Sequence, residues 1–394
     1  MAIHALAKDI ISFSQSIFGA DFIPLHRPVF EGNEKKYLLD CIDSNFVSSV
    51  GEKVVEFEGK VSAFTGAKYT VAMVNGTAAL HVAIQLVGVE AGDEVISQAL
   101  TFIATCNAIS YTGAFPVFID VDRDTMGMSP SALEAFLGTN AEKRNGRVFN
   151  KITGRRIGGC IPMHTFGFPC RVEEIASICS DWGIPLIEDA AESLGSYVGN
   201  RHTGTIGSVG ILSFNGNKVI TTGGGGMLIT DDRNLAIRAK YITTTAKVAH
   251  PYEFVHDEIG YNYRMPNLNA ALGCAQMERL EEFLAIKTKL AHQWATFIDE
   301  TDVDFVKAIG GNQANHWLNT IVLDSLEDRN EFLEYTNSNG VMTRPIWKLM
   351  SELDMFKNCQ NDGLINSIWL QDRVVNIPSS VPDGALSKFG KRES

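Results

Sequence analysis

The sequence predicts an α/β protein: a large domain with a mixed, mainly parallel sheet flanked by helices, and a smaller C-terminal α+β domain. The chain has 394 residues, which suits two or three structural units. Between about residues 50 and 235, short apolar runs alternate with helical patterns, as in a mainly parallel sheet covered on both faces. From Asn267 a long helical pattern leads out of that region toward the smaller domain.

Short apolar runs, several of them bounded by Gly, Asp or Asn, predict the strands of the large domain. They lie at residues 70–74, 94–97, 116–120, 159–163, 185–188, 211–214 and 226–230, with helices such as 77–87 and 172–181 between them. The charged stretch within 131–158 predicts a solvated excursion or a surface β-hairpin. The resulting division is an N-terminal segment 1–50, a large domain 51–280 and a small domain 281–394.

Charge and cysteine content exclude some classes of protein. Basic residues number 34 and acidic ones 46, which gives a formal charge of -12 and argues against a nucleic-acid binder. The seven cysteines include no CxxC pair, so neither a metal site nor a disulfide framework is expected. The N-terminus lacks the pattern of a signal peptide, and no apolar run is long enough to cross a membrane. We therefore expect a cytoplasmic protein.

The turn after the first predicted strand has the pattern of an anion site. In VAMVNGTAALHVAI the strand ends at Val74, and a helix begins just after Gly76 and Thr77. Such a turn points backbone N–H groups and the positive end of a helix dipole at one place, where a phosphate would bind. The same NGT sequence is also an ordinary turn and helix cap, so this motif alone leaves both interpretations open.

Two carboxylates follow the predicted strand 185–188 in PLIEDAAESLGS. Asp189 lies just past the strand, where it would keep a pyridine nitrogen protonated, or would simply cap the next turn. Glu192 would reach the phenolic oxygen of the same ring.

The stretch GILSFNGNKVITTGGGGMLIT is the most informative one. Ser213 and Asn215 precede Lys218, and a run of four glycines follows, which lets backbone approach a ligand closely. Lys218 stands between two strand-like runs, and a partly desolvated lysine there loses its proton easily and can form a Schiff base. No GK[ST] follows the glycines, so the run is not a P-loop.

A further polar group, which includes Asn262, precedes a helix in GYNYRMPNLNAALG. These polar side chains could recognise a ligand, or they could simply hold a structural loop together by hydrogen bonds.

In this order and spacing, EDAAESLGS, SFNGNK, TTGGGGM and GYNYRMPNLNAALG resemble the DegT-type (StrS superfamily) sugar aminotransferases, which are fold-type I pyridoxal phosphate enzymes. The resemblance covers nearly the whole chain, from IPLHRPVFEGNE to TRPIWK. It implies a fold-type I architecture in which 51–280 is the cofactor-binding domain. It also implies a homodimer whose active sites are shared between subunits.

The resemblance assigns roles to matching residues. It makes Lys218 the Schiff-base lysine and proton carrier, and Asp189 the partner of the pyridinium nitrogen. The remaining cofactor-binding residues that it implies are Gly76, Thr77, Phe102, Glu192, Ser213, Asn215 and, from the neighbouring subunit, Asn262. Glu192 stands where relatives often have Gln or His, so its contact with the ring oxygen requires one of the two oxygens to be protonated.

Toward the C-terminus, HWLNT and TRPIWK are similar to the branch that makes bacillosamine- and legionaminic-type sugars. That branch implies amination at C4 of UDP-4-keto-6-deoxy-N-acetylglucosamine with glutamate as donor, for surface-glycan or nonulosonic-acid synthesis. It makes Arg344, Trp347 and Lys348 candidates for holding the nucleotide sugar, and an arginine fork suits a diphosphate. His164 in MHTFG matches a family position near the active site and is a further substrate-binding candidate.

Three alternatives remain open. A 3-keto-sugar aminotransferase or a dehydratase would use the same fold, although related dehydratases have His at the lysine position. A non-catalytic nucleotide-sugar sensor would bind without turnover. A plain amino-acid aminotransferase would not need the C-terminal sugar-binding segments.

Overall fold

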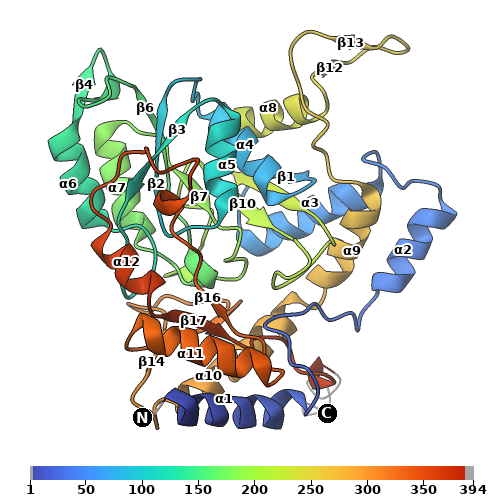
Figure 1. The fold of residues 1–394 in the computed structure, drawn as a ribbon. Helices are drawn as coiled ribbons and strands as arrows, with labels where there is room; N and C mark the ends of the chain where they lie inside the picture. Colours follow the sequence, from blue (N-terminus) through green and yellow to red (C-terminus); the bar gives the residue numbers. More distant parts are fainter. Residues whose placement is uncertain (1–2, 387–394) are drawn as a thin grey trace.

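The predicted mixed sheet lies at the centre of the larger part of the molecule (Figure 1). The computed structural model describes residues 3–386. Isolated bridges Cys160–Leu186 and Met163–Asp189 join a three-stranded and a four-stranded sheet into one. Across it the strands are β3 (Phe115–Ile119), β2 (Glu94–Gln98), β6 (Ile157–Ile161), β7 (Ile187–Asp189), β10 (Val209–Ser213), β11 (Gly226–Thr230) and β1 (Tyr69–Met73). Only β11 runs antiparallel to its neighbours, which confirms the predicted mainly parallel sheet.

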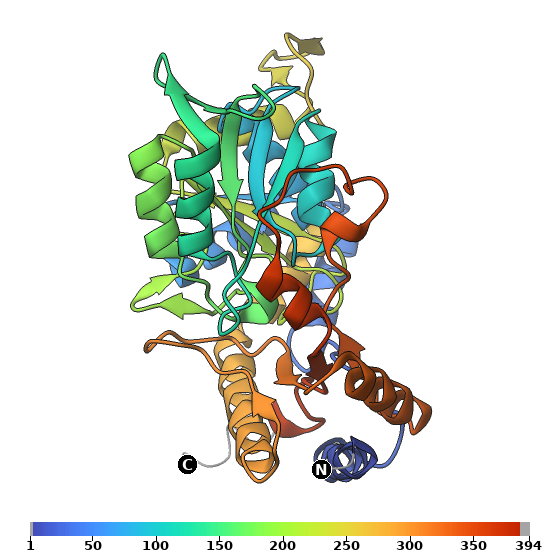
Figure 2. The same ribbon diagram turned by 60° about the vertical axis from the view of Figure 1, so that its left-hand side comes forward.

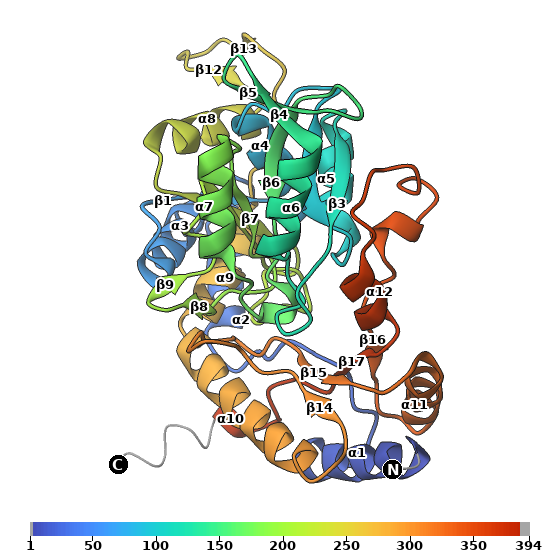
Figure 3. The same ribbon diagram turned by 90° about the vertical axis from the view of Figure 1, so that its left-hand side faces the viewer.

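Helices cover both faces of this sheet, because successive side chains of a strand point to opposite sides. Val71 and Met73 face one apolar cluster, and Ala72 between them faces another. One face is covered by α4 (Gly76–Leu86), α5 (Ile103–Tyr111) and α8 (Arg233–Thr243). The other is covered by α3 (Glu52–Thr65), α6 (Pro130–Asn140), α7 (Val172–Trp182) and α9 (Asn267–Met277), of which α6 and α7 lie side by side in Figure 3.

The charged stretch within 131–158 contains the predicted hairpin, formed by β4 (Ala141–Arg144) and β5 (Arg147–Asn150). Residues 131–140, which precede the charged run, belong instead to helix α6 (Pro130–Asn140), which is capped by the Ser129 side chain and has Pro130 in its first turn. Two smaller hairpins are β8 (Tyr197–Val198) with β9 (Arg201–His202), and β12 (Lys247–Val248) with β13 (Val255–His256). The β12–β13 hairpin projects from the top of the molecule in Figure 1.

The long helical pattern from Asn267 is two helices rather than one. Helix α9 ends at Met277, and α10 (Leu280–Ile298) begins after a break at Glu278 and Arg279. The start of α10 shares an apolar cluster with α9, through Leu280 and Phe283, whereas Trp294 further along α10 lies in the cluster of the smaller part of the molecule. Periodicity in the sequence shows an apolar face but does not show where that face changes partner.

The smaller part of the molecule is an antiparallel sheet with helices against it (Figure 2). Its strands, in order across the sheet, are β14 (Asp304–Phe305), β15 (Asn319–Val322), β17 (Val374–Ile377) and β16 (Arg344–Pro345). The N-terminal helix α1 (Ile3–Phe18) packs here, through Leu6 and Ile10, against α10 and α11 (Leu326–Ser338). Helix α2 (Glu34–Asp43) packs instead on α9, and α12 (Ile365–Gln371) reaches back to Asp120 of the large sheet.

Within residues 3–386, no helix combines the length and the hydropathy needed to span a bilayer.

Candidate active site

Lys218 lies in the loop between β10 and β11, with its side chain 14% exposed. Its backbone N–H donates to the carbonyl of Asn215 at 3.0 Å, which makes a tight turn. The amine Nζ lies 3.1 Å from Oε1 of Glu192 and 3.9 Å from the centroid of the Trp317 indole. The amine is thus held between a carboxylate of the large domain and an aromatic face from a loop more than ninety residues further along the chain.

Asp189 is the last residue of β7 and is 2% exposed. The hydroxyl of Thr105 donates to Oδ2 at 2.6 Å, and the N–H of Ala191 donates to Oδ1 at 3.2 Å. Burial raises the pKa of Asp189 above its ordinary value, and these two hydrogen bonds and the charge of Lys218 offset only part of that shift. A buried carboxylate of this kind is stabilised further by a cationic partner such as a protonated ring nitrogen.

Glu192 is also buried, at 4% exposure, on the loop that follows Asp189. Its Oε2 accepts the N–H of Phe166 at 2.9 Å, and its Oε1 contacts Lys218. Burial raises the pKa of Glu192 and the Lys218 charge opposes that shift. A raised pKa favours the protonated form, which is the form able to donate to a phenolic oxygen.

The start of helix α4 forms a close-fitting cradle beside Ser213. The Asn75 side chain caps the helix by accepting the N–H of Ala78 at 2.7 Å. The first N–H groups of a helix have no acceptor within the helix, so those of Gly76 and Thr77 are placed for an anion. A Cβ on Gly76 would lie 3.2 Å from the Cβ of Ser213, so this cradle fits glycine.

Aromatic side chains line one side of the cluster. Phe102 is 48% exposed at the start of α5, the helix that also holds Thr105. Its ring centroid lies 6.2 Å from that of Trp347, which in turn lies 4.8 Å from Phe166.

His164, which was predicted to bind substrate, has protein partners on both ring nitrogens, and a contact with substrate stays a prediction. The ring is fully buried, and its Nδ1 accepts the N–H of Cys170 at 3.2 Å. Nε2 therefore carries the proton and donates to Glu188 Oε2 at 3.1 Å. His164 thus supports the buried carboxylate of Glu188.

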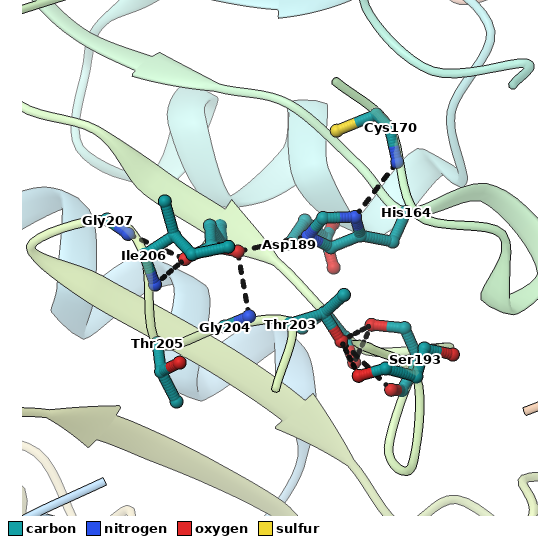
Figure 4. A network of polar contacts seen from close by, with 12 residues as sticks. His164, Cys170, Asp189, Ser193, Thr203, Gly204, Thr205, Ile206 and Gly207 are labelled. Carbon is teal, nitrogen blue, oxygen red and sulfur yellow. Dashed lines mark hydrogen bonds and ion pairs between the residues drawn. The ribbon is translucent and has the colours of Figure 1, made fainter. Parts of the chain in front are cut away.

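Glu188 ties strand β7 to the loop before β10. Its oxygens accept the N–H groups of three residues labelled in Figure 4, Gly204, Ile206 and Gly207, at 2.7, 2.5 and 2.6 Å. Burial alone would raise the pKa of Glu188, but His164 and the N–H groups lower it below the ordinary range. Glu188 therefore fixes the backbone immediately before Asp189.

Of the other predicted residues, Asn215 takes part in the Lys218 turn through its backbone carbonyl, whereas Asn262, Arg344 and Lys348 lie outside the cluster around Lys218. Asn215 and Asn262 are exposed. Arg344 donates to the Asn337 side chain and to the Thr343 carbonyl on the small-domain sheet, and Lys348 is 63% exposed beside Glu352. Their expected contacts with cofactor phosphate and substrate remain predictions.

Three residues of the site were not predicted from the sequence: Thr105, Asn315 and Trp317. Thr105 lies one helical turn after Phe102, so the helical spacing was a usable signal. Asn315 donates from its amide to the carbonyls of Glu192 and Leu194 at 2.8 and 2.9 Å. Nothing in its local sequence shows that it lies beside residues 192–194.

A lysine, a buried aspartate at a strand end and a helix N-terminus, brought together on this mixed sheet, define a pyridoxal phosphate enzyme with the fold-type I architecture. The cradle at Gly76 fits a phosphate, and the buried Asp189 fits a ring nitrogen. The chain belongs to the DegT/DnrJ/EryC1/StrS aminotransferase family, whose model matches residues 28–382. It is a pyridoxal phosphate-dependent sugar aminotransferase.

Individual relatives cover most of the chain. EpsN of Bacillus subtilis (strain 168) is 36% identical over 335 residues, which are 85% of this chain and 84% of EpsN. GDP-perosamine synthase of Escherichia coli O157:H7 is 34% identical over 91% of this chain and 93% of its own length. Among solved structures, the aminotransferase TlmJ from Streptoalloteichus hindustanus superposes with a TM-score of 0.83 at 23% identity, over 93% of this chain and 96% of that one.

Proposed function

We propose that this enzyme moves an amino group from glutamate to C4 of a nucleotide-linked 4-keto-6-deoxy sugar, with UDP-4-keto-6-deoxy-N-acetylglucosamine as the first candidate, for surface-glycan or nonulosonic-acid synthesis. The observation that carries the amino transfer is the position of Lys218 Nζ, 3.1 Å from Glu192 and on the same sheet edge as Asp189. The choice of sugar rests on the similarity of HWLNT and TRPIWK to the bacillosamine and legionaminic-acid branch.

In this proposal the bound cofactor supplies an electron sink and carries the amino group between the two substrates. Lys218 would hold the cofactor covalently through Nζ. It then takes the α-proton of glutamate on Nζ and, in the second half, gives a proton to C4 of the sugar. Asp189 keeps the ring nitrogen protonated, and Thr105 fixes the carboxylate that does so through its 2.6 Å hydrogen bond.

Further side chains hold the cofactor. Gly76, Thr77 and Ser213 bind its phosphate, and the N-terminal end of α4 adds the favourable helix dipole. Phe102 stacks on the ring. Glu192 in its protonated form donates to the ring oxygen, in agreement with the raised pKa that burial gives it. Asn215, two residues after Ser213, contributes from the loop that contains Lys218.

We place Arg344, Trp347 and Lys348 on the nucleotide sugar. Trp347 supports this best, because its ring lies beside Phe102 and Phe166 at the edge of the site. Arg344 is exposed and suits a diphosphate, whose oxygens it would bind with two parallel hydrogen bonds.

The working unit in this proposal is a homodimer in which Asn262 reaches the partner's cofactor phosphate. Support comes from a cavity of about 1160 Å³ between residues 44–56, α8 and Arg264. Apolar side chains are exposed at its rim, on the β12–β13 hairpin and just after that hairpin, namely Phe46, Val50, Val55, Ile237, Tyr252, Phe254 and Ile259. Exposed apolar surface of this extent is typical of a protein interface.

A GDP-linked 4-keto-6-deoxy sugar is the second candidate substrate. The observation that favours it is the 34% identity to a GDP-perosamine synthase over 91% of this chain. The two candidates differ in the base and in the acetamido group at C2, so one assay separates them.

The test is to incubate the protein, pyridoxal phosphate and glutamate with each keto sugar in turn, and to identify products by mass spectrometry and NMR. A 4-amino sugar formed together with 2-oxoglutarate from the UDP substrate would support the proposal. Product from the GDP substrate alone would show that the GDP-linked sugar, and not the UDP-linked one, is the substrate. A 3-amino or deoxygenated product would show that the enzyme catalyses a different reaction from the one proposed. A protein that binds the sugar without turnover would be a sensor instead.

A further inference from the structure

The indole of Trp317 provides a surface for the charged amine of Lys218 on the side that Glu192 does not occupy. Nζ lies 3.9 Å from the ring centroid, which is close contact for a cation and an aromatic face. Trp317 is 5% exposed and the Lys218 side chain 14%, so water does not screen this contact strongly.

Trp317 is held in place by contacts from three segments of the chain. Its Nε1–H donates to the carbonyl of Asn217 at 2.6 Å, and its backbone N–H donates to Oδ1 of Asn315 at 2.8 Å. Its own carbonyl accepts from Nζ of the buried Lys287 at 3.2 Å. The bond to Asn217 ties the indole to the residue immediately before Lys218, so ring and amine keep their relative position.

Asn315 links this surface to Glu192. The same side chain that accepts the Trp317 N–H donates to the carbonyls of Glu192 and Leu194. Between Asn315 and Trp317, His316 has a left-handed backbone with φ of 51°, which is uncommon for a residue other than glycine.

We propose that Trp317 is a positioning residue whose indole face receives Lys218 while Nζ carries the proton taken from a substrate, an inference that rests on the proposed function. In each half of the reaction the proton passes from a carbon to Nζ, which becomes an ammonium, and then from Nζ to the next carbon. Glu192 contacts the same amine, but in the proposed function its carboxyl is protonated and offers the ammonium no negative charge. An indole face attracts the charge and has no lone pair that takes the proton, so the proton stays on Nζ.

The first test measures the amine without the reaction. Cofactor-free protein is treated with trace acetic anhydride at fixed pH, and mass spectrometry compares acetylation of Lys218 with that of the exposed Lys357. Trp317→Leu removes the ring, while Trp317→Phe keeps an aromatic face and loses only the bond to Asn217. The control Trp182→Leu removes an indole that lies under Lys143, away from the site.

Loss of the cation–π contact should make Lys218 react about fivefold faster in Trp317→Leu, because the indole face that covers the amine and attracts its charge is gone. Trp317→Phe should stay within about twofold of the unchanged protein, and Trp182→Leu should equal it. Folded Trp317→Leu that reacts at the unchanged rate would overturn the proposal. Because no turnover is involved, this result does not depend on whether the proposed reaction is correct.

The second test follows bleaching of the yellow, cofactor-loaded protein by glutamate and by glutamate deuterated at the α-carbon. If Trp317 supports proton transfer, Trp317→Leu should slow bleaching and enlarge the isotope effect at unchanged cofactor content. A merely structural role would lower cofactor content and leave the isotope effect as it was, which would contradict the proposal. If glutamate does not bleach the unchanged protein, the proposed transfer of an amino group from glutamate is wrong, and the proposed role of Trp317 in that reaction fails for a separate reason.

Discussion

Replacing Glu188 by Gln tests whether the buried carboxylate beside Asp189 holds this part of the fold together. Glu188 is fully buried and accepts four hydrogen bonds, three from backbone N–H groups and one from His164. Each oxygen accepts two of them. Gln has the same shape, but its NH₂ group takes the place of one oxygen and faces two donors.

The expected cost follows from these contacts. A change of tautomer does not rescue the His164 contact, because the N–H of Cys170 already occupies Nδ1. Hydrogen bonds to a charged group contribute about 1.5–3 kcal/mol each, so losing two should lower the free energy of unfolding by about 3–6 kcal/mol. The matched control Glu300→Gln changes an exposed residue at the end of α10 and should cost less than about 0.5 kcal/mol.

The assay is urea unfolding followed by circular dichroism, at one protein concentration because association shifts apparent stability. The difference between the two proteins should also depend on pH. The folded pKa of Glu188 lies below its ordinary value of 4.5, so its contribution is present above that pH and is lost as pH falls further. Glu188→Gln with the stability of the control, or with a difference that persists unchanged into acid, would refute this reasoning.

Three further outcomes are expected. Lys218→Ala should lower turnover by at least about 10²-fold, because no other group carries the proton; single-turnover bleaching measures it, and normal bleaching would exclude Lys218 from the role. Asp189→Asn should slow both halves by about 10- to 100-fold while some cofactor stays bound, measured from the rates with each substrate and from the visible absorption. Burial lowers the pKa of Lys287 to about 7 from its ordinary 10.5, so between these values the unfolded chain binds a proton that the folded one does not. Relative to Lys287→Met, the unchanged protein should therefore gain about 1.4 kcal/mol of stability per pH unit from pH 7.5 to 9.5 in urea unfolding, and parallel curves would contradict the assignment.

The amino-acid sequence by itself determined the class of fold and the order of its parts. Short apolar runs with turn residues at their ends predicted every strand of the large sheet, because strand length and burial are local properties of the chain. The same local patterns placed Asp189 at a strand end and Lys218 in a glycine-rich loop between two strands. They also predicted the hairpin of β4 and β5, though not the helical start of that stretch.

Tertiary structure alone decided which side chains meet. His164 matches a family position near the active site, yet both of its ring nitrogens contact protein partners, Glu188 and Cys170. Trp317 lies 99 residues after Lys218 and contacts it only because the loop before β15 returns to the large domain. Such contacts depend on packing between distant segments, and a pattern within one segment carries no information about its partner in space.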